Sequence, residues 1–381
     1  MKLKDIGEII TGNTPSKKND EYYSSKDILF IKPGDIEENY ITSLKNSEEY
    51  ISEKARGKAK ILPEGAVLVT CIGTIGKVGI LEKEATCNQQ INAIIPNDKV
   101  ISKYLAYLIQ SKQKILKLKA NAPVVPIINK KDFSEIEINI CNKDNQIKIV
   151  KQLDLLKKII DRRKKQIEEL DNIIKSQFVE MFGTPFINEK SWQNGHIKDL
   201  VSEVRYGTSK PANKNGKYKY LRMNNITYEG KLDLSNLKYI DISENEIEKY
   251  TTKNGDILFN RTNSRELVGK TCVYNLNEKM VIAGFVIRVR TNSSANPYFI
   301  STYLNTKYLK NKLYNICKNA SGQSNINAQE LQNIEIYIPP IELQNKFADF
   351  VKVIDKQKFE IEKSLKEMEN LYNSLMDEYF G

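Results

Sequence analysis

The sequence predicts an α+β protein in which two similar globular segments, each mixing strands with helices, alternate with two long helices. Three observations predict this architecture. The chain of 381 residues is too long for one ordinary domain, it repeats itself at a constant offset, and each copy ends in a long heptad-patterned segment. The expected boundaries are 1–143 and 184–340 for the globular segments, and 144–183 and 341–381 for the helices.

The repeat becomes visible when the ends of the two long segments, Phe182-Gly183 and Phe380-Gly381, are aligned, because this sets an offset of 198 residues. Without a gap, the offset then pairs Ile128 with Ile326, Asn129 with Asn327 and Gln146 with Gln344. A period of this length does not fit a solenoid, so it indicates one module that has been duplicated.

Each long segment carries an apolar seam whose steps alternate between three and four residues, as in a coiled coil. The first seam comprises Leu153, Leu156, Ile160, Ile167, Leu170, Ile174 and Met181, and the second Val351, Ile354, Ile361, Leu365, Met368, Tyr372 and Leu375. Arg163 and Gln177 interrupt the first seam, whereas Lys358 interrupts the second at a different repeat. The shared register predicts that the two helices pack on each other.

The ends of both helices carry stop signals. Pro339-Pro340 precedes the second helix, and Gly183 and Gly381 follow the last turns as C-terminal caps. At ~1.5 Å per residue, such a helix is roughly 57 Å long and would hold two globular segments at a fixed spacing. Further apolar positions, such as Ile173 and Phe359, either serve a separate partner or lie under the chain's own globular segments.

Short strands and one or two short helices are expected in each globular segment. The first segment has candidate strands at 28–32, 66–71, 76–81, 91–95 and 136–140, and a candidate helix at 103–117. The second has candidate strands at 218–223, 256–259, 270–274, 281–289 and 334–338, and a candidate helix at 298–314.

The net charge of +11 favours a polyanionic partner, nucleic acid first. A proteome rich in Lys and Asn would also make the chain basic, but it would spread the charge evenly. Instead, segments 1–143 and 184–340 carry +4 and +8, whereas the two helices together carry −1. We therefore expect a nucleic-acid face on the globular segments.

Other features of the composition exclude several classes of protein. The sequence contains no run of 18 apolar residues that could span a membrane, and its N-terminus lacks the apolar stretch of a secretory signal. Five scattered cysteines without a Cys-x-x-Cys pair argue against a disulfide framework and a cysteine zinc site, and they predict a reducing, cytoplasmic compartment. The single histidine, His196, excludes a histidine cluster on a metal.

No catalytic motif is complete. Gly269-Lys270-Thr271 ends like a phosphate-binding loop, but Ser264 stands where that motif needs glycine, so a turn is favoured. The only Pro-Pro, at 339–340, is not part of an amino-methyltransferase motif. Glu229-Gly-Lys231 matches half of a nuclease motif without its preceding Pro-Asp. A structural role is preferred for His196 over that of a general base.

Taken in order, several motifs resemble the specificity (S) subunits of type I restriction–modification systems. The carriers are Lys4-Asp5-Ile6 and Lys198-Asp199-Leu200, the strands that follow Gly65 and Gly255, Gly322–Asn327 and, most specifically, Ile336-Tyr-Ile-Pro-Pro-Ile-Glu-Leu-Gln-Asn-Lys-Phe347. The resemblance covers the whole chain. The first copy departs from it at Ile138–Gln146, which lacks the prolines, and at Ala122–Pro126.

The resemblance implies a non-catalytic subunit that recognises DNA. Each globular segment would be a target recognition domain for one half of a divided sequence in double-stranded DNA. The helices would form an antiparallel coiled coil that sets the spacer and docks two methyltransferase (M) subunits, to which restriction (R) subunits attach. S-adenosylmethionine, ATP and Mg²⁺ would belong to those partner subunits. The alternative is a coiled-coil adaptor without DNA specificity.

Candidate base-reading residues follow from side chains that can pair with base edges, arginine with guanine above all. They are Lys32, Thr70, Thr74 and Lys77 in the first segment, and Arg222, Asn224, Asn260, Arg261, Asn263 and Arg265 in the second. The competing interpretation is a solvated strand face for Arg222, Arg288 and Arg290, and turn charge for Lys77 and Lys270. The loop Asn260–Arg265 has no charged counterpart at Thr70–Thr74, which predicts that it recognises a different half-site.

Overall fold

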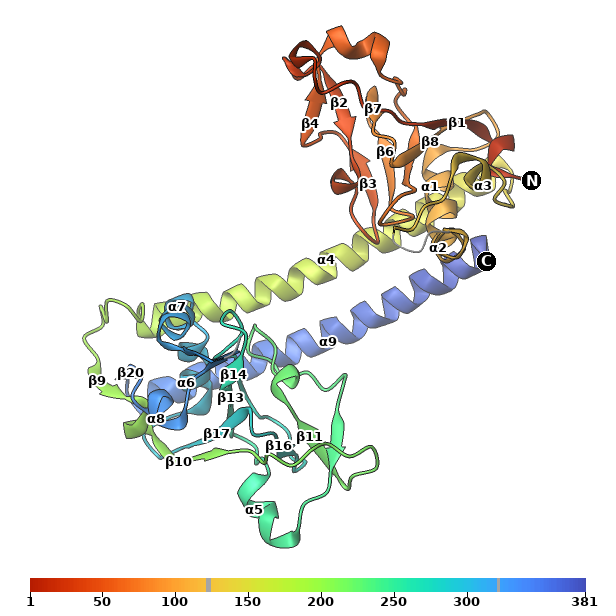
Figure 1. Ribbon diagram of the computed structural model, residues 1–381. Helices are drawn as coiled ribbons and strands as arrows, with labels where there is room; N and C mark the ends of the chain where they lie inside the picture. The colour runs from red at the N-terminus through yellow and green to blue at the C-terminus, as the bar shows by residue number, and fades with distance from the viewer. Residues whose placement is uncertain (121–124, 321–322) are drawn as a thin grey trace. The chain divides into compact units, whose positions relative to one another are not determined.

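The computed structural model describes residues 1–120, 125–320 and 323–381 (Figure 1). The loops Ala122–Pro126 and Gly322–Asn327 therefore fall partly outside the described residues. The chain divides into two compact units, which are described one at a time. Unit 1 comprises Met1–Lys164 and Lys363–Gly381, and unit 2 comprises Lys165–Glu362. Each unit holds one globular segment and a part of both long helices.

Unit 1 contains two sheets and three short helices. Its strands are β1 (Gly7–Thr11), β2 (Ile28–Ile31), β3 (Ile41–Leu44), β4 (Glu49–Ile51), β5 (Val67–Thr70), β6 (Val78–Leu81), β7 (Ala85–Cys87) and β8 (Ile91–Pro96). They form a sheet of order β1-β8-β5-β6-β3 and a second of order β4-β2-β7. The helices are α1 (Ser102–Ser111), α2 (Gln113–Lys119) and α3 (Lys130–Ser134). α1 packs on the larger sheet, and the ring of its Tyr104 packs in a tilted arrangement against Phe380 of the last helix, with 5.1 Å between ring centroids.

Unit 2 repeats this plan. Its strands are β9 (Gln193–His196), β10 (Val201–Tyr206), β11 (Tyr218–Leu221), β12 (Lys238–Ile240), β13 (Ile257–Asn260), β14 (Thr262–Asn263), β15 (Thr271–Val273), β16 (Val281–Ile282), β17 (Val286–Thr291), β18 (Lys318–Ala320), β19 (Gln323–Asn325) and β20 (Glu335–Ile338). Its helices are α5 (Ile247–Tyr250), α6 (Pro297–Leu304), α7 (Lys307–Ile316) and α8 (Ala328–Gln332). In the described residues, the sheets β10-β17-β13-β15 and β12-β11-β16 match those of unit 1 except for the edge strand β3, and β14-β19-β18 and β20-β9 are additional.

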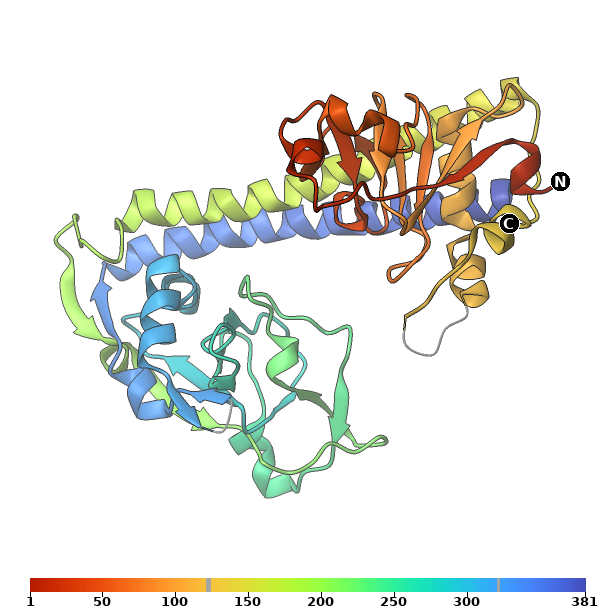
Figure 2. The ribbon, with the colours of Figure 1, turned by 45° about the horizontal axis from the view of Figure 1, so that its top comes forward.

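An aromatic cluster joins the globular part of unit 2 to its portion of the long helices. Phe178 and Phe182 pack against Phe299 of α6 and Phe347, with ring centroids 4.9–5.8 Å apart. In Figure 2 the light-blue helices of unit 2 lie between its strands and its long helices, where this core cluster is found. All four rings are fully buried, so the helices are part of the core of unit 2.

The two long helices are α4 (Lys143–Phe182) and α9 (Ile341–Phe380), each of 40 residues. They run antiparallel within each unit: Lys164 pairs with Glu369 at 2.9 Å in unit 1, and Asp171 pairs with Lys358 in unit 2. Every predicted seam residue is buried or half-buried, while most neighbouring positions are exposed. The mixed α/β architecture with a duplicated module and two long coiled-coil helices is thus as predicted.

A buried glutamine at equivalent positions of the two units fixes each long helix to its globular segment. In unit 1, the Gln146 amide accepts from the Ile101 N–H at 3.0 Å and donates to Cys141 O at 2.8 Å. In unit 2, Gln344 accepts from the Asn296 N–H at 2.9 Å and donates to Pro339 O at 2.8 Å. The 198-residue repeat is therefore preserved at the level of individual hydrogen bonds.

Several predicted elements are wrong in detail. The expected strand 136–140 is only an isolated bridge between Lys2 and Glu137, because no more than Met1–Leu3 runs beside it, whereas β20 has β9 as a full partner. The expected strand 281–289 is two strands, interrupted between Ile282 and Val286. Each expected short helix is also two, broken at Lys112 in unit 1 and after Leu304 in unit 2. Within the described residues, no helix is both long and apolar enough to cross a membrane.

Candidate nucleic-acid interface

In each unit, one loop leaves a fully buried strand, β5 or β13, and is held by the segment that precedes the long helix. In unit 1, Cys71 O accepts from the Ile128 N–H at 2.9 Å, and in unit 2 Arg261 O accepts from the Ile326 N–H at 2.9 Å. These bonds make Cys71 and Arg261 structurally equivalent. The two loops therefore follow equivalent strands and are held by equivalent backbone hydrogen bonds, but the loop of unit 2 has more residues.

A lysine ties each loop to a neighbouring 3-10 helix. The Lys77 amine donates to Pro33 O at 3.1 Å, and the Lys270 amine donates to Met223 O at 2.9 Å. Pro33 and Met223 begin equivalent 3-10 helices, Pro33–Asp35 and Met223–Asn225. Burial lowers the pKa of Lys270. Lys77, a candidate base reader, is therefore engaged in holding the frame.

Two further candidates, Thr70 and Asn260, are fully buried at the ends of the two equivalent strands. The Thr70 hydroxyl donates to Thr74 O and accepts from the Lys77 N–H at 3.0 Å. Asn260 donates to Thr262 O at 3.3 Å and accepts from the Asn263 amide at 3.1 Å. Both side chains shape the loops and have no exposed surface with which to contact a base.

Two arginines of the unit 2 loop lie on aromatic rings. The Arg261 guanidinium carbon is 4.7 Å from the centroid of the Tyr206 ring, and that of Arg265 is 4.2 Å from the Tyr314 ring. Arg265 also donates from Nε to Tyr314 O at 3.0 Å. Both arginines are half-buried and lie beside exposed tyrosines. The loop thus presents two guanidinium groups that each lie against an aromatic ring.

The remaining candidates lie at the equivalent 3-10 helices and on the unit 1 loop. Lys32 and Arg222 each stand immediately before a 3-10 helix; Lys32 pairs with Glu49, and Arg222 donates to Asn236 O at 3.0 Å. The pairing lowers the pKa of Glu49. Thr74 and Asn224 are exposed. Each unit therefore has one exposed candidate, Thr74 or Asn224, and both are uncharged.

The interpretation of Arg288 as part of a solvated strand face is wrong. Arg288 is fully buried in β17, where it donates to Thr251 O and pairs with Glu203 at 3.1 Å. Arg290 pairs with the same Glu203 at 2.6 Å and with Asp256 at 2.8 Å. Burial lowers the pKa of Arg288. These arginines are part of an internal ion network and not of a DNA surface.

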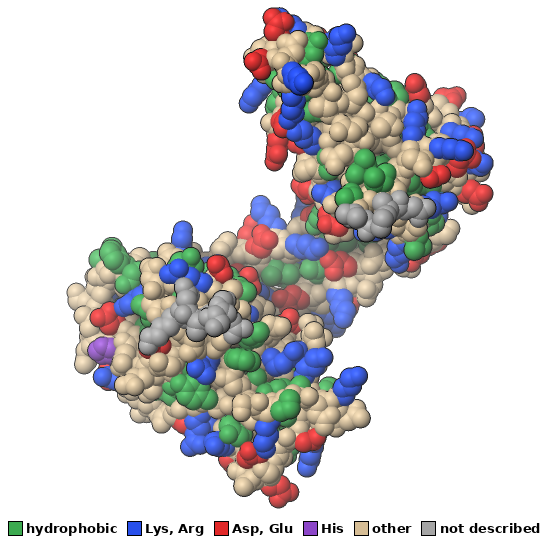
Figure 3. Space-filling view, viewed as in Figure 1, with side chains coloured by type: hydrophobic (Ala, Val, Ile, Leu, Met, Phe, Trp, Pro, Cys, Tyr) green, Lys and Arg blue, Asp and Glu red, His purple; other side chains and the backbone are tan. Residues whose placement is uncertain are grey.

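The aromatic neighbours of the loop arginines were missed in the sequence. Tyr206 ends β10, a strand that the pattern did not predict, and Tyr314 lies in α7. Phe285, in the interruption between β16 and β17, is half exposed, and its carbonyl accepts from the Arg261 N–H at 2.9 Å. These three aromatic residues come from separate segments, so only the three-dimensional structure shows that they lie beside the loop. On the face in Figure 3, Lys and Arg side chains occur on both units.

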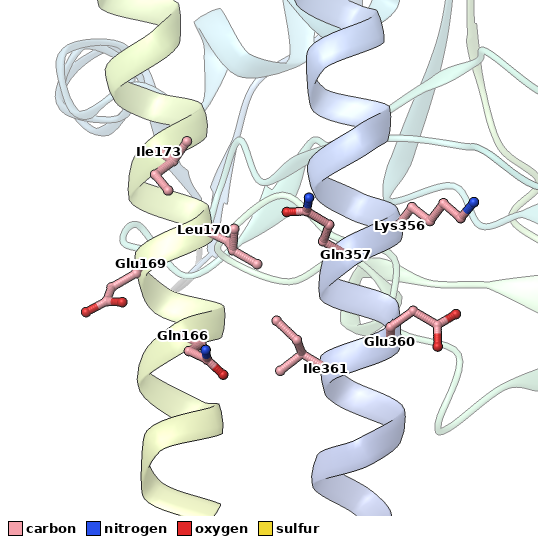
Figure 4. A pocket seen from close by; sticks show the side chains of 8 residues that line it. All are labelled: Gln166, Glu169, Leu170, Ile173, Lys356, Gln357, Glu360 and Ile361. Atoms are coloured by element: carbon pink, nitrogen blue, oxygen red, sulfur yellow. The ribbon is translucent and has the colours of Figure 1, made fainter. Parts of the chain in front are cut away.

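A groove of about 530 Å³ lies on the unit 2 part of the helix pair (Figure 4). It is lined by Gln166, Glu169, Leu170 and Ile173 of α4, and by Lys356, Gln357, Glu360 and Ile361 of α9. Leu170 and Ile361 belong to the predicted seam, and Ile173 to the further apolar positions. The groove therefore leaves apolar side chains of both helices accessible. Among the described residues, no cluster of His, Cys, Asp and Glu could hold a metal ion.

Comparison with known proteins supplies the context of this interface. Residues 1–172 and 189–369 match the family described as the type I restriction modification DNA specificity domain. The type I restriction enzyme MjaIX specificity subunit of Methanocaldococcus jannaschii is 27% identical over 386 residues, covering 94% of this chain and 88% of the relative. The EcoKI specificity subunit of Escherichia coli is 24% identical over 84% of this chain and 75% of its own length. The type I restriction–modification S subunit from M. genitalium shares the fold, with a TM-score of 0.60 at 14% identity over 100% of this chain and 95% of that chain.

Proposed function

The chain belongs to the type I restriction–modification DNA specificity family, and we propose that it selects the DNA target of such a complex by recognising two half-sites. The observation that carries this proposal is that the two units share their supporting hydrogen bonds but differ in the loops that these bonds hold. Hydrogen bonds from Gln146 and Gln344 recur in the two units, whereas the loops after β5 and β13 differ in length and charge. A repeated frame with different loops is the arrangement expected for two different halves of one sequence.

Direct readout comes from loop residues that keep accessible surface. Arginine pairs bidentately with guanine edges in the major groove, so Arg261 and Arg265 serve the half-site of segment 184–340. Thr74 serves the other half-site, and Lys32, which precedes the 3-10 helix Pro33–Asp35, is a second candidate there. Phosphate contacts from the surplus of basic residues supply most of the sequence-independent affinity.

The partners are double-stranded DNA, two methyltransferase subunits and the restriction subunits. The methyltransferase subunits dock on the helix pair, whose apolar side chains outside the seam include Ile173 and Phe359, 45% and 63% exposed. S-adenosylmethionine, ATP and Mg²⁺ bind to the partner subunits. This chain contributes no catalytic group, and it acts in the cytoplasm, where its five free cysteines stay reduced. Membership of the family does not favour the alternative of an adaptor without DNA specificity.

The test is DNA binding by the chain assembled with its methyltransferase subunits, measured over a range of salt concentrations. We expect tight, sequence-dependent binding whose logarithmic affinity falls linearly with the logarithm of salt, because counterions are released from the phosphates. Binding to a random duplex should show the salt dependence without the sequence preference. A salt slope near zero, or equal affinity for every duplex, would contradict the proposed function.

A further inference from the structure

We propose that Tyr206 is a positioning residue that orients Arg261 for a guanine in the half-site of segment 184–340. The inference rests on the proposed function and deepens it, because it names a base class and the residue that orients the reader. It begins from the ring of Tyr206, which lies 4.7 Å from the guanidinium carbon of Arg261.

The pair is held from the backbone on both sides. The Arg261 N–H donates to Phe285 O at 2.9 Å, and its carbonyl accepts from the Ile326 N–H at 2.9 Å. The Tyr206 hydroxyl accepts from the Ala328 N–H at 2.8 Å, at the start of α8. Neither the backbone of the arginine nor the ring beneath it is therefore free to shift.

The guanidinium has hydrogen-bonding capacity that the protein does not use. Its Nε is covered and has no acceptor in the part of the chain that the structure describes. Within the described residues, the two terminal nitrogens make no hydrogen bond or ion pair either. Stacking on an aromatic face fixes the plane of the group and leaves that outer edge available. Two coplanar donors on a fixed edge match the O6 and N7 acceptors of guanine.

Unit 1 shows that the fold does not need this pair. Gly12 and Gly207 donate to the carbonyls of Ile91 and Val286, both at 3.1 Å, so Thr11 and Tyr206 are equivalent. In place of the ring and the guanidinium, unit 1 has a short polar chain. The Thr11 hydroxyl donates to Asn92 at 2.7 Å, and Asn92 donates to the Cys71 sulfur at 3.2 Å.

All three equivalent positions carry different residues in the two units. Thr11, Asn92 and Cys71 of unit 1 correspond to Tyr206, Ile287 and Arg261 of unit 2. Asn92 and Cys71 are almost fully buried, whereas Tyr206 is 41% exposed and Arg261 is half-buried. A structural requirement of the frame would retain similar chemistry in both units. A half-buried arginine against an exposed ring in only one unit instead fits recognition of one half-site.

The experiment uses the full chain assembled with its methyltransferase subunits and a library of duplexes randomised at both half-sites. Methylated products are sequenced for the wild type, Arg261→Ala, Tyr206→Leu and Tyr206→Phe. Tyr239→Leu is the control, since Tyr239 is a similarly exposed tyrosine on β12 of the same unit. We expect Arg261→Ala to reduce the preference for guanine at one position by roughly 5- to 100-fold. Tyr206→Leu should relax the same position, while Tyr206→Phe, which keeps the ring, and Tyr239→Leu should retain the preference.

If Tyr206→Leu folds poorly, the double variant Tyr206→Thr with Arg261→Cys takes its place. This variant installs the unit 1 residues and should also relax only this position. Relaxation at a different position for Tyr206 than for Arg261 would overturn the inference. So would a uniform loss over all sequences with a shallower salt slope, which is the behaviour of a phosphate contact. A wild-type complex without any sequence preference would instead contradict the proposed function itself. A selective wild type with an unchanged Tyr206→Leu variant would overturn this inference alone.

Discussion

Lys358 of α9 forms an ion pair with Asp171 of α4 inside unit 2. Lys358 occupies the one seam position of α9 where the heptad pattern has a charge, and it is 4% exposed. Lys231, from the globular segment, pairs with the same carboxylate at 3.2 Å. Burial lowers the pKa of Lys358 and raises that of the neighbouring Asp355. The interruption of the seam is thus a buried lysine within a half-buried charge cluster that joins both helices to the globular segment.

Lys358→Ala should lower the free energy of unfolding by about 3 kcal/mol, because it leaves the half-buried carboxylates of Asp171 and Asp355 with less compensation. Replacing the pair by Lys358→Met and Asp171→Leu should recover most of this loss, since apolar side chains need no partner. Denaturant unfolding of the full chain measures both. Lys352→Ala, at an exposed position of α9, is the control and should stay within ~0.5 kcal/mol of wild type. Equal effects of Lys358→Ala and Lys352→Ala would show that the cluster does not stabilise unit 2.

Leu153 and Leu170 occupy seam positions in different surroundings. Leu153 is fully buried in the core of unit 1, whereas Leu170 lines the open groove of unit 2. Leu153→Ala should therefore cost ~2–5 kcal/mol, and Leu170→Ala clearly less, because fewer contacts are lost and no closed cavity forms. Denaturant unfolding of the two variants gives the comparison. A larger loss for Leu170→Ala would mean that the groove is closed in solution.

Ile173→Asp should weaken assembly with the methyltransferase subunits by at least tenfold, because a charge would replace an exposed apolar side chain of the groove. Val179→Asp is the matched control: Val179 lies on the same helix and is similarly exposed, but it does not line the groove. Titration of each variant with the methyltransferase subunits measures the affinity. Equal affinities for Ile173→Asp and Val179→Asp would place the docking surface elsewhere.

Glu203 makes the stability of unit 2 dependent on pH. Burial raises the pKa of its carboxyl group, but Arg288, Arg290 and Arg205 outweigh burial, and the pKa is lowered overall. An acid with a lowered pKa stabilises the fold above its unfolded pKa of ~4.3, and this contribution disappears as the pH falls through the folded value. Glu203→Gln should therefore destabilise the protein at pH 7, and the difference from wild type should shrink below about pH 4. Thermal melting across this range tests the prediction, with the exposed Glu244→Gln as control. A difference that grows on acidification would contradict it.

The sequence predicts the duplicated frame because the frame is made of local signals that occur twice. The heptad seams, the capping glycines and the paired glutamines are readable in one dimension, and each occupies a comparable place in the structure. The loop environment is not readable in this way. Lys77 and Thr70 look like surface donors in the sequence, but their hydrogen bonds with Pro33 and Thr74 engage them in the frame.

The residues that orient the loop arginines come from distant segments. Tyr206 and Tyr314 reach Arg261 and Arg265 only through the pairing of strands and the packing of α7. Arg288 illustrates the opposite error, since an arginine in a strand suggests exposure unless the acidic partners Glu203 and Asp256 are known to surround it. Sequence pattern therefore predicts which loop differs between the copies, and spatial contacts decide which side chains of that loop are free to bind.

The central claim is that the two globular segments recognise two different halves of one DNA sequence. Sequencing of the bases methylated by the assembled complex on genomic DNA tests this claim most directly. We predict a divided motif with a fixed number of unspecified base pairs between its halves, whose centres lie about 10 base pairs apart so that both segments reach the same face of the duplex. Exchange of segment 184–340 for that of a relative should change one half and leave the other intact. A single uninterrupted motif, or an exchange that alters both halves, would contradict the account.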